Sequence, residues 1–115
     1  MTKQNVDISI IIINYNRSNY LERCLRSCAD QIVFNKSYEI IFVDDGSKDN
    51  SFKIAKKFSS SVRLFGLKKN KGISYASNFA LKKSKGKFFI RVDSDDFINK
   101  HTIDFMSKIL EQNNK

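Results

Sequence analysis

Two short runs of apolar residues constrain the fold of this chain more than any other feature of its sequence. Residues 9–13 (SIIII) and 39–43 (EIIFV) are nearly continuous in β-branched and aromatic side chains, with polar residues on both sides. Apolar side chains at consecutive positions are typical of strands buried on both faces of a parallel sheet. We therefore expect both runs to be central strands that helices cover on each side.

Helical patterns alternate with strands along the rest of the chain. Apolar residues recur at spacings of three and four over four segments, and two further segments have the composition of strands. The helical segments are residues 19–32, 49–58, 73–81 and 103–110, and the additional strands are residues 62–65 and 87–92. Strands that alternate with helices, without hairpin signals, predict an α/β domain, a three-layer α/β/α sandwich with a mostly parallel central sheet.

Local signals predict the ends of two helices. Asn19 and Glu22 have the spacing of a capping box, which would begin the first helix, and Gly86 would end the third.

The chain has 115 residues and 41% hydrophobic content, with ten Phe and four Tyr. That is enough for one core, so we predict a single domain over residues 1–115.

The formal net charge of +9 fits either a solvated, lysine-rich surface or an anionic partner, and composition alone does not decide between them. Nucleic acid, an anionic membrane surface and a phosphorylated small molecule all fit this charge, and the lysines are densest between Lys68 and Lys87. Nucleic acid is disfavoured because the sequence has neither zinc-finger spacing nor an aromatic RNA-binding signature. No apolar run approaches the ~18 residues of a membrane-spanning helix, and polar residues near Met1 interrupt any signal-peptide pattern. We therefore expect a cytoplasmic protein.

Cys24 and Cys28 are the two cysteines of the chain, and they lie four residues apart in the first helical pattern. A zinc site would need a second pair or a nearby His, and the sequence supplies neither. We expect two buried thiols in a reducing compartment.

Polar residues gather where three of the four expected strands end. The strands lead into residues 14–17 (NYNR), 44–47 (DDGS) and 93–96 (DSDD). Ligands of parallel α/β sheets bind beyond the carboxyl ends of the strands, so these loops should meet at one edge. The five carboxylates of the last two loops need a cation or hydrogen-bond donors to offset their repulsion. Carboxylates suit Mg²⁺ or Mn²⁺ bound together with substrate phosphates, which predicts a metal-dependent diphosphate site.

Other polar and aromatic residues near these loops could bind the ligand or serve only the fold. Tyr15 could stack on a nucleobase or lie at the edge of the core. Arg17 and Arg91 could neutralise phosphate or be surface charges, and alternation along its strand favours exposure of Arg91. Asp49 is expected to cap a helix, and the single His, His101, is expected at the surface because no nucleophile or carboxylate is arranged around it.

The four motifs together resemble the amino-terminal half of family 2 glycosyltransferases. They are residues 9–16 (SIIIINYN), 39–47 (EIIFVDDGS), 70–72 (NKG) and 93–96 (DSDD), in this order and at family-like spacing. The resemblance extends from about Val6 to about Leu110. It implies a GT-A fold, Rossmann-like, that binds a nucleotide diphosphate sugar, usually a UDP-sugar, and transfers the sugar with inversion.

The resemblance also implies roles for individual residues. Tyr15 would lie against the base, Asp45, with Asp44 beside it, would hydrogen-bond the uracil, and Asp93 would contact the ribose or sugar. Asp95 would be the principal ligand of Mn²⁺ or Mg²⁺ in a DxD motif, with Asp96 supporting the loop. The implied site residues are Tyr15, Asn16, Asp44, Asp45, Gly72, Asp93 and Ser94 for the nucleotide sugar and Asp95 with Asp93 for the metal.

Two departures from the family pattern limit what the chain can do alone. Ser77 stands where many members carry an arginine in the helix after the Gly72 motif. Family members also continue beyond the DxD motif into an acceptor site with a general base, and no residue here matches that base. We therefore expect an amino-terminal fragment that binds donor, with a glycan or lipid-linked acceptor handled elsewhere. An exposed apolar face, which could form a dimer, would mark the missing half.

Other functions remain open at this point. A non-catalytic nucleotide-binding or assembly module would also explain a chain without an acceptor half. A Mg²⁺ phosphoacceptor site also lies at strand ends of a parallel sheet, whereas a dinucleotide site lacks its Gly-x-Gly-x-x-Gly signature after the first strand. The basic charge is compatible with work at the inner face of an anionic membrane.

Overall fold

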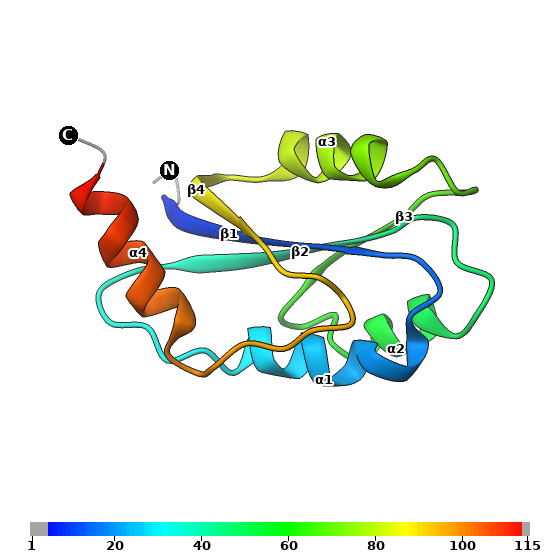
Figure 1. Ribbon diagram of the computed structural model, residues 1–115, viewed down its shortest axis with the longest axis horizontal. Helices are drawn as coiled ribbons and strands as arrows, with labels where there is room; N and C mark the ends of the chain where they lie inside the picture. The colour runs from blue at the N-terminus through cyan, green and yellow to red at the C-terminus, as the bar shows by residue number, and fades with distance from the viewer. Residues whose placement is uncertain (1–4, 114–115) are drawn as a thin grey trace.

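The computed structural model describes residues 5–113, which form a four-stranded parallel sheet with helices on both faces (Figure 1). The strands are β1 (Val6–Asn14), β2 (Tyr38–Asp44), β3 (Arg63–Gly66) and β4 (Gly86–Arg91). The helices are α1 (Ser18–Ala29), α2 (Ser51–Lys56), α3 (Ile73–Lys83) and α4 (Thr102–Gln112). The strand order is β3-β2-β1-β4, so the predicted α/β architecture is confirmed.

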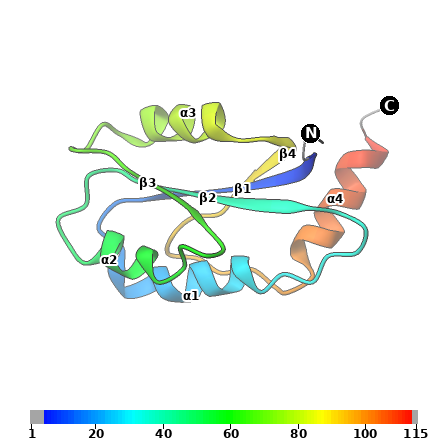
Figure 2. The same ribbon diagram turned by 180° about the vertical axis from the view of Figure 1, so that it is seen from behind.

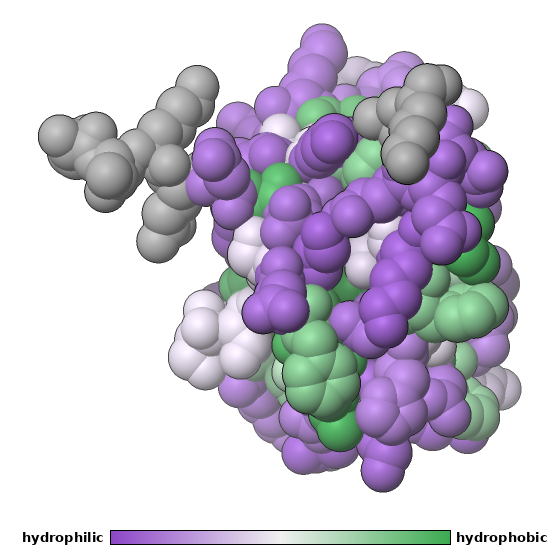
Figure 3. All heavy atoms as spheres, turned by 90° about the vertical axis from the view of Figure 1, so that its left-hand side faces the viewer, coloured by the Kyte–Doolittle hydropathy of each residue, from purple (hydrophilic) through white to green (hydrophobic). Residues whose placement is uncertain are grey.

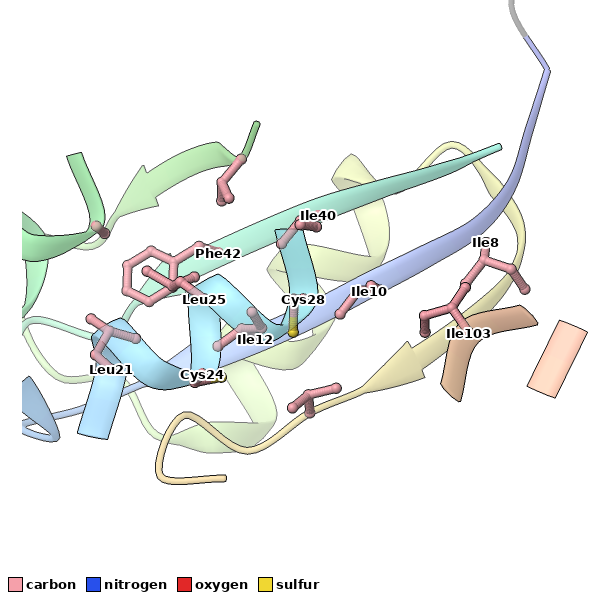
Figure 4. Packing of buried hydrophobic residues seen from close by; sticks show 13 residues of the cluster. Ile8, Ile10, Ile12, Leu21, Cys24, Leu25, Cys28, Ile40, Phe42 and Ile103 are labelled. Carbon is pink, nitrogen blue, oxygen red and sulfur yellow. The ribbon is translucent and has the colours of Figure 1, made fainter. Parts of the chain in front are cut away.

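Side chains of β1 alternate between two cores. The larger core contains Ile8, Ile10 and Ile12 of β1, Leu21, Cys24, Leu25 and Cys28 of α1, and Phe42 of β2 (Figure 4). The smaller core, on the opposite face, contains Ile11, Ile41 and Val43 with Ala76 and Ala80 of α3. Because helices cover both faces, the central strands need apolar residues at consecutive positions, which explains the two runs that dominate the sequence.

The layers are clear in two opposite views. α1 and α2 lie on one face of the sheet and α3 on the other (Figures 1 and 2). α4 packs through Ile103 beside Ile8, on the face that α1 covers (Figure 4). The end of the molecule that carries α4 shows mostly hydrophilic side chains with separate hydrophobic patches between them (Figure 3). Within residues 5–113, no helix has both the length and the apolar character needed to cross a bilayer.

The beginning of α1 differs from the expected capping box. No side chain of its own first turn caps the helix, so the predicted pairing of Asn19 with Glu22 is wrong, and α1 ends at Ala29, short of the predicted end. Asp49, from the loop before α2, instead accepts a hydrogen bond from the Ser18 N–H at 3.0 Å. A residue distant in sequence has replaced the local cap, and Asp49 has the capping role predicted for it.

Gly86 also differs from its expected role. α3 stops at Lys83, and Gly86 is the first residue of β4. A Cβ at Gly86 would lie 2.5 Å from Ser9 Oγ and 2.6 Å from Ser9 N. The glycine is required because β4 begins in close contact with β1, and not because a helix ends there.

Glu39 of β2 joins β1, β3 and the residue just before β4 near the amino-terminal ends of the strands. From β2 it accepts hydrogen bonds from Ser9 Oγ at 2.6 Å, from Arg63 at 2.9 Å and from the Lys85 N–H at 2.6 Å. Its side chain is only 11% exposed. Burial by itself raises the pKa of the Glu39 carboxyl, but these donors outweigh it and hold the pKa below its usual value.

We expect Glu39→Gln to lower the free energy of unfolding by about 1–3 kcal/mol at neutral pH, because an amide loses the charge-assisted bonds. Since the folded-state pKa is lowered, the carboxylate stabilises the fold fully above the ordinary glutamate pKa. That stabilisation is lost as the pH falls through the lowered value. Urea unfolding across pH should therefore show a gap between wild type and variant that narrows in acid.

Glu22→Gln is the matched control, because Glu22 pairs with Arg26 at an exposed site on α1. We expect this change to alter stability by less than about 0.5 kcal/mol. A gap for Glu39→Gln as small as that of the control, or one that stays constant into acid, would contradict the prediction.

Candidate nucleotide-sugar site

A cleft of about 450 Å³ opens at the carboxyl edge of the sheet, a volume that suits a small molecule. Its lining consists of Ile13, Tyr15, Arg17, Asp45, Asn70, Gly72, Ile73, Arg91, Asp93, Ser94 and Asp95. β1 and β4 are neighbours in the sheet, although β2 and β3 separate them in the chain. The order of the strands reverses at this point, which is where parallel α/β sheets bind their ligands.

Asp45 organises one wall of the cleft. Its Oδ1 accepts the Lys71 N–H at 2.7 Å, and its Oδ2 accepts the Gly72 N–H and an Asn70 Nδ2–H, both at 3.0 Å. The residue is 2% exposed, and these donors compensate its buried charge. Asp45 therefore fixes the loop that leads into α3 while it also lines the cleft.

Gly46 lets this wall form. Its φ is +72°, and a Cβ there would lie 2.4 Å from the carbonyl carbon of Lys69 and 2.5 Å from the Asn70 N. Only glycine fits both the positive φ and the close approach of the two backbones. The loop after β2 and the loop before α3 are thus in direct backbone contact.

A second network joins the loops after β1 and β2 outside the cleft. Asp44 Oδ1 accepts hydrogen bonds from Asn14 Nδ2 at 3.0 Å and Ser47 Oγ at 2.6 Å. Asn16 donates its N–H to Ser47 Oγ at 2.9 Å and accepts the Lys48 N–H through its Oδ1, also at 2.9 Å. Neither Asn16 nor Asp44 lines the cleft. The structure places both in loop support, and their contact with a nucleotide stays a prediction.

The acidic loop after β4 presents two carboxylates to the cleft. The side chains of Asp93 and Asp95 are 60% and 49% exposed. Each lies beside an arginine that also lines the cleft, with Arg91 3.5 Å from Asp93 and Arg17 3.9 Å from Asp95. Asp96 lies outside the lining, and its N–H closes a turn on the Asp93 carbonyl at 2.9 Å.

These carboxylates suit a divalent cation that a diphosphate helps to bind. Within residues 5–113, no group of three or more His, Cys, Asp or Glu side chains could hold a metal alone. Mg²⁺ usually takes only one or two carboxylates and completes its shell with phosphates and water, so Asp93 and Asp95 are sufficient. Exposed ion pairs such as Arg17 with Asp95 are worth about 0–1 kcal/mol, so a cation can replace them readily.

One face of α1 holds the acidic loop in place. The Cys24 thiol donates to the Asp93 carbonyl at 3.5 Å, and Ser27 Oγ accepts the Ile98 N–H at 3.1 Å. The neighbouring Cys28 and burial raise the pKa of the Cys24 thiol, so it stays protonated. Cys24, which the sequence predicts only as a buried thiol, thus also supports the acidic loop.

Gln31 extends this support beyond the end of α1. Its Nε2 donates to the Asn99 carbonyl at 2.6 Å, and its Oε1 accepts the Ile103 N–H at 2.9 Å. We expect Gln31→Ala to lower the free energy of unfolding by about 1–2 kcal/mol, because it leaves both backbone groups without this partner. Hydrogen–deuterium exchange should become faster in residues 93–103 than in β1. Unchanged exchange there, or an equal effect of Arg26→Ala on the exposed face of α1, would contradict the prediction.

Most of the predicted site residues lie together in the cleft. Tyr15, Asp45, Gly72, Asp93, Ser94 and Asp95 all line it. His101 is exposed and outside the lining, as expected. The apolar contributions of Ile13 and Ile73 were not predicted from the sequence. Ile13 could have been found from the alternation of β1, which turns it away from the core that Ile12 enters.

Comparison with known protein families settles which class of protein carries this cleft. The family described as Glycosyl transferase family 2 has a model that matches residues 9–115. This chain belongs to glycosyl transferase family 2. The resemblance of its four ordered motifs to that family is therefore confirmed.

Relatives of this family 2 chain are named glycosyltransferases of bacteria. The poly(ribitol-phosphate) beta-N-acetylglucosaminyltransferase TarP of Staphylococcus aureus is 33% identical over 110 residues, which are 93% of this chain and 34% of TarP. The chondroitin synthase of Pasteurella multocida is 35% identical over 104 residues, 88% of this chain and 10% of the synthase. The chain thus spans about a third or less of the length of these relatives.

Solved structures confirm the GT-A fold. S. aureus TarS 1–349 in complex with UDP matches with a TM-score of 0.84 and 32% identity, over 93% of this chain and 32% of that one. A mannosyltransferase from Pyrobaculum calidifontis in complex with GDP-Man and Mn²⁺ matches with a TM-score of 0.81, over 97% of this chain and 33% of that one. At 18% identity, the second structure supports the fold alone.

Proposed function

We propose that this chain supplies the donor site of an enzyme that transfers a sugar from a UDP-sugar to a glycan or lipid-linked acceptor with inversion. The observation that carries the proposal is the cleft itself, where the ring of Tyr15 and the carboxylates of Asp93 and Asp95 line one cavity. TarS has been solved with UDP and with UDP-GlcNAc, and its 32% identity over 93% of this chain supports a uridine donor.

The lining residues divide into those for the base and those for the diphosphate. Tyr15 is 41% exposed, so its ring is accessible for stacking on a base. Asp45 holds the Gly72 loop beside it and would accept a hydrogen bond from the uracil. Asp93 would contact the ribose or sugar. Asp95 and Asp93 would hold Mn²⁺ or Mg²⁺, which when bound supplies positive charge to the diphosphate.

The two arginines of the cleft have a role in the same charge balance. Arg17 and Arg91 now lie beside Asp95 and Asp93. Once those carboxylates hold a cation, both guanidinium groups are free to pair with phosphate oxygens. Positive groups fixed at this place stabilise the charge that grows on the leaving diphosphate as the sugar departs.

Nucleotide preference tests the proposal. In calorimetric titrations with Mn²⁺ present, UDP should bind at least about ten-fold more tightly than ADP, because a carboxylate acceptor such as Asp45 discriminates by hydrogen bonding to the base. Equal affinity for both nucleotides, or no binding of either to folded protein, would contradict it.

Tyr15→Ala should weaken UDP binding by about 1–3 kcal/mol, the usual contribution of a base stacked on an aromatic ring. Tyr20→Ala is the matched control, because Tyr20 is a similarly exposed tyrosine on α1 that does not line the cleft. Calorimetry on both variants measures the effect. If the two variants bind UDP with equal affinity, Tyr15 does not contact the base.

A further inference from the structure

The side of the sheet that α3 covers carries positive charge that no acidic residue of the same segment offsets. Residues 50–92 contain ten Lys and two Arg but no Asp or Glu. Seven of these lysines lie in α3 and the segments that flank it, and all seven are exposed: Lys68, Lys69, Lys71, Lys82, Lys83, Lys85 and Lys87. Among the described residues, none of the seven forms an ion pair.

The opposite side of the sheet differs in this respect. Glu22 on α1 lies 3.1 Å from Arg26 and 3.9 Å from Lys57, at the end of α2. Acidic side chains are thus interleaved with the basic ones on the face covered by α1 and α2. The positive charge of the molecule is therefore least compensated around α3, which Figures 1 and 2 show alone on its face.

Large apolar side chains are exposed among these lysines. Ile73 and Tyr75 of α3 are 54% and 50% exposed, and Phe89 of β4 is 55% exposed. Phe89 points away from the larger core because its neighbours Phe88 and Ile90 pack into it. We call these three residues and the seven lysines the α3 surface. Lysines mixed with exposed aromatic and aliphatic side chains are typical of surfaces that lie on anionic membranes.

We propose that the α3 surface docks on a bilayer that contains anionic phospholipids. The ammonium groups would pair with headgroup phosphates, and Tyr75 and Phe89 would enter the headgroup region. A membrane fits better than a soluble polyanion, because exposed Ile73 and Phe89 gain from burial at a lipid interface and gain nothing from a charged polymer.

Docking in this way would orient the cleft toward the lipid. Ile73 belongs both to the lining of the cleft and to the α3 surface. Arg91 lines the cleft and follows Phe89 on the same face of β4. The mouth of the cleft would then lie beside the headgroups, where a lipid-linked acceptor could reach it. Only this last step rests on the proposed function, and the docking itself does not.

Two triple substitutions with equal charge change test the location. Lys82, Lys83 and Lys85 are changed to Gln in one variant, and Lys53, Lys56 and Lys57, on the α2 side, in the other. Cosedimentation uses vesicles of phosphatidylcholine with and without phosphatidylglycerol. Each lysine near an anionic surface strengthens binding about five-fold, so the first variant should bind roughly 100-fold more weakly and the second should stay close to wild type.

Single tryptophans give a second readout that leaves the lysines intact. The chain has no Trp, so Tyr75→Trp, Phe89→Trp and Tyr20→Trp each place one reporter, the last on α1 as a control. With anionic vesicles, emission should shift to shorter wavelength for Tyr75→Trp and Phe89→Trp, and not for Tyr20→Trp.

Three results would overturn the proposal. They are equal loss of vesicle binding in both triple variants, no binding of wild type to anionic vesicles, and no difference in emission shift between the α3-surface reporters and Tyr20→Trp. Binding to long-chain polyphosphate without binding to vesicles would assign the surface to a soluble polyanion instead. Failure of UDP to bind would leave the vesicle results standing, since those need no nucleotide.

Discussion

Asp95→Asn should abolish the metal-dependent part of nucleotide binding while leaving the fold intact. The side chain is half exposed, and its ion-pair partner is Arg17 at 3.9 Å, so its replacement disturbs little of the folded chain. An amide is neutral and a weak ligand for a hard cation. We expect Mn²⁺ to bind in the presence of UDP roughly 100-fold more weakly, equivalent to about 3 kcal/mol.

Asp96→Asn is the matched control for this experiment. It lies in the same loop and makes the same charge change, but Asp96 does not line the cleft. The paramagnetic resonance signal of free Mn²⁺ should fall when wild type or Asp96→Asn is added together with UDP. For Asp95→Asn with UDP, the signal should fall no further than it does with UDP and no protein. Equal losses in both variants would mean that loop charge, and not a ligand at Asp95, attracts the cation.

Asp45→Asn should reduce stability and nucleotide binding together. Asp45 accepts three hydrogen bonds from donors in the loop 70–72, and an amide would turn its own NH₂ group toward one or more of them. A buried donor left unpaired costs about 1–3 kcal/mol, so we expect a total loss of about 2–4 kcal/mol in the free energy of unfolding. UDP affinity should fall about 100-fold as the wall beside Gly72 moves.

Asp44→Asn separates support of the loops from support of the cleft. Asp44 also accepts buried hydrogen bonds, from Asn14 and Ser47, so this variant should lose stability to a similar extent. Because Asp44 lies outside the cleft, this variant should nevertheless bind UDP within about three-fold of wild type, and a larger loss of affinity would instead support the contact with uracil predicted from the sequence. Urea unfolding and calorimetry measure the two quantities. If both variants lose UDP affinity equally, Asp45 supports the loops in general and has no role specific to the cleft.

Sequence patterns predicted the parts of this fold that local chemistry determines. The two apolar runs identified β1 and β2 because a strand buried on both faces needs apolar residues at every position. Periodicity identified the helices, although α1 and α2 are shorter than expected. The meeting of the loops after β1, β2 and β4 followed from parallel topology alone, since carboxyl ends of parallel strands share one edge.

Contacts between distant segments were not predictable in the same way. The hydrogen bond from Ser18 to Asp49 replaces the local cap that Asn19 and Glu22 could have formed. The spacing of Gly86 after a helical pattern is the same for a helix end as for a strand start, and only its approach to Ser9 decides between them. Such contacts depend on which strands become neighbours in the sheet, and local periodicity carries no information about strand order.

The same limit applies to the site. The sequence identified Asp45 as a cleft residue but not its three hydrogen bonds to the loop before α3. It likewise gave no sign that Cys24, Ser27 and Gln31 hold the segment from Asp93 onward. These side chains hydrogen-bond to backbone groups far along the chain, and backbone groups are the same whatever the residue is, so the sequence does not show them.

Titration of UDP with and without Mn²⁺ tests the central claim most directly. Calorimetry on the folded chain should show UDP binding at least about ten-fold more tightly with Mn²⁺ than after its removal by EDTA, because a cation held by Asp93 and Asp95 would supply positive charge to the diphosphate. Equal affinity under the two conditions would contradict a metal-dependent donor site in this cleft.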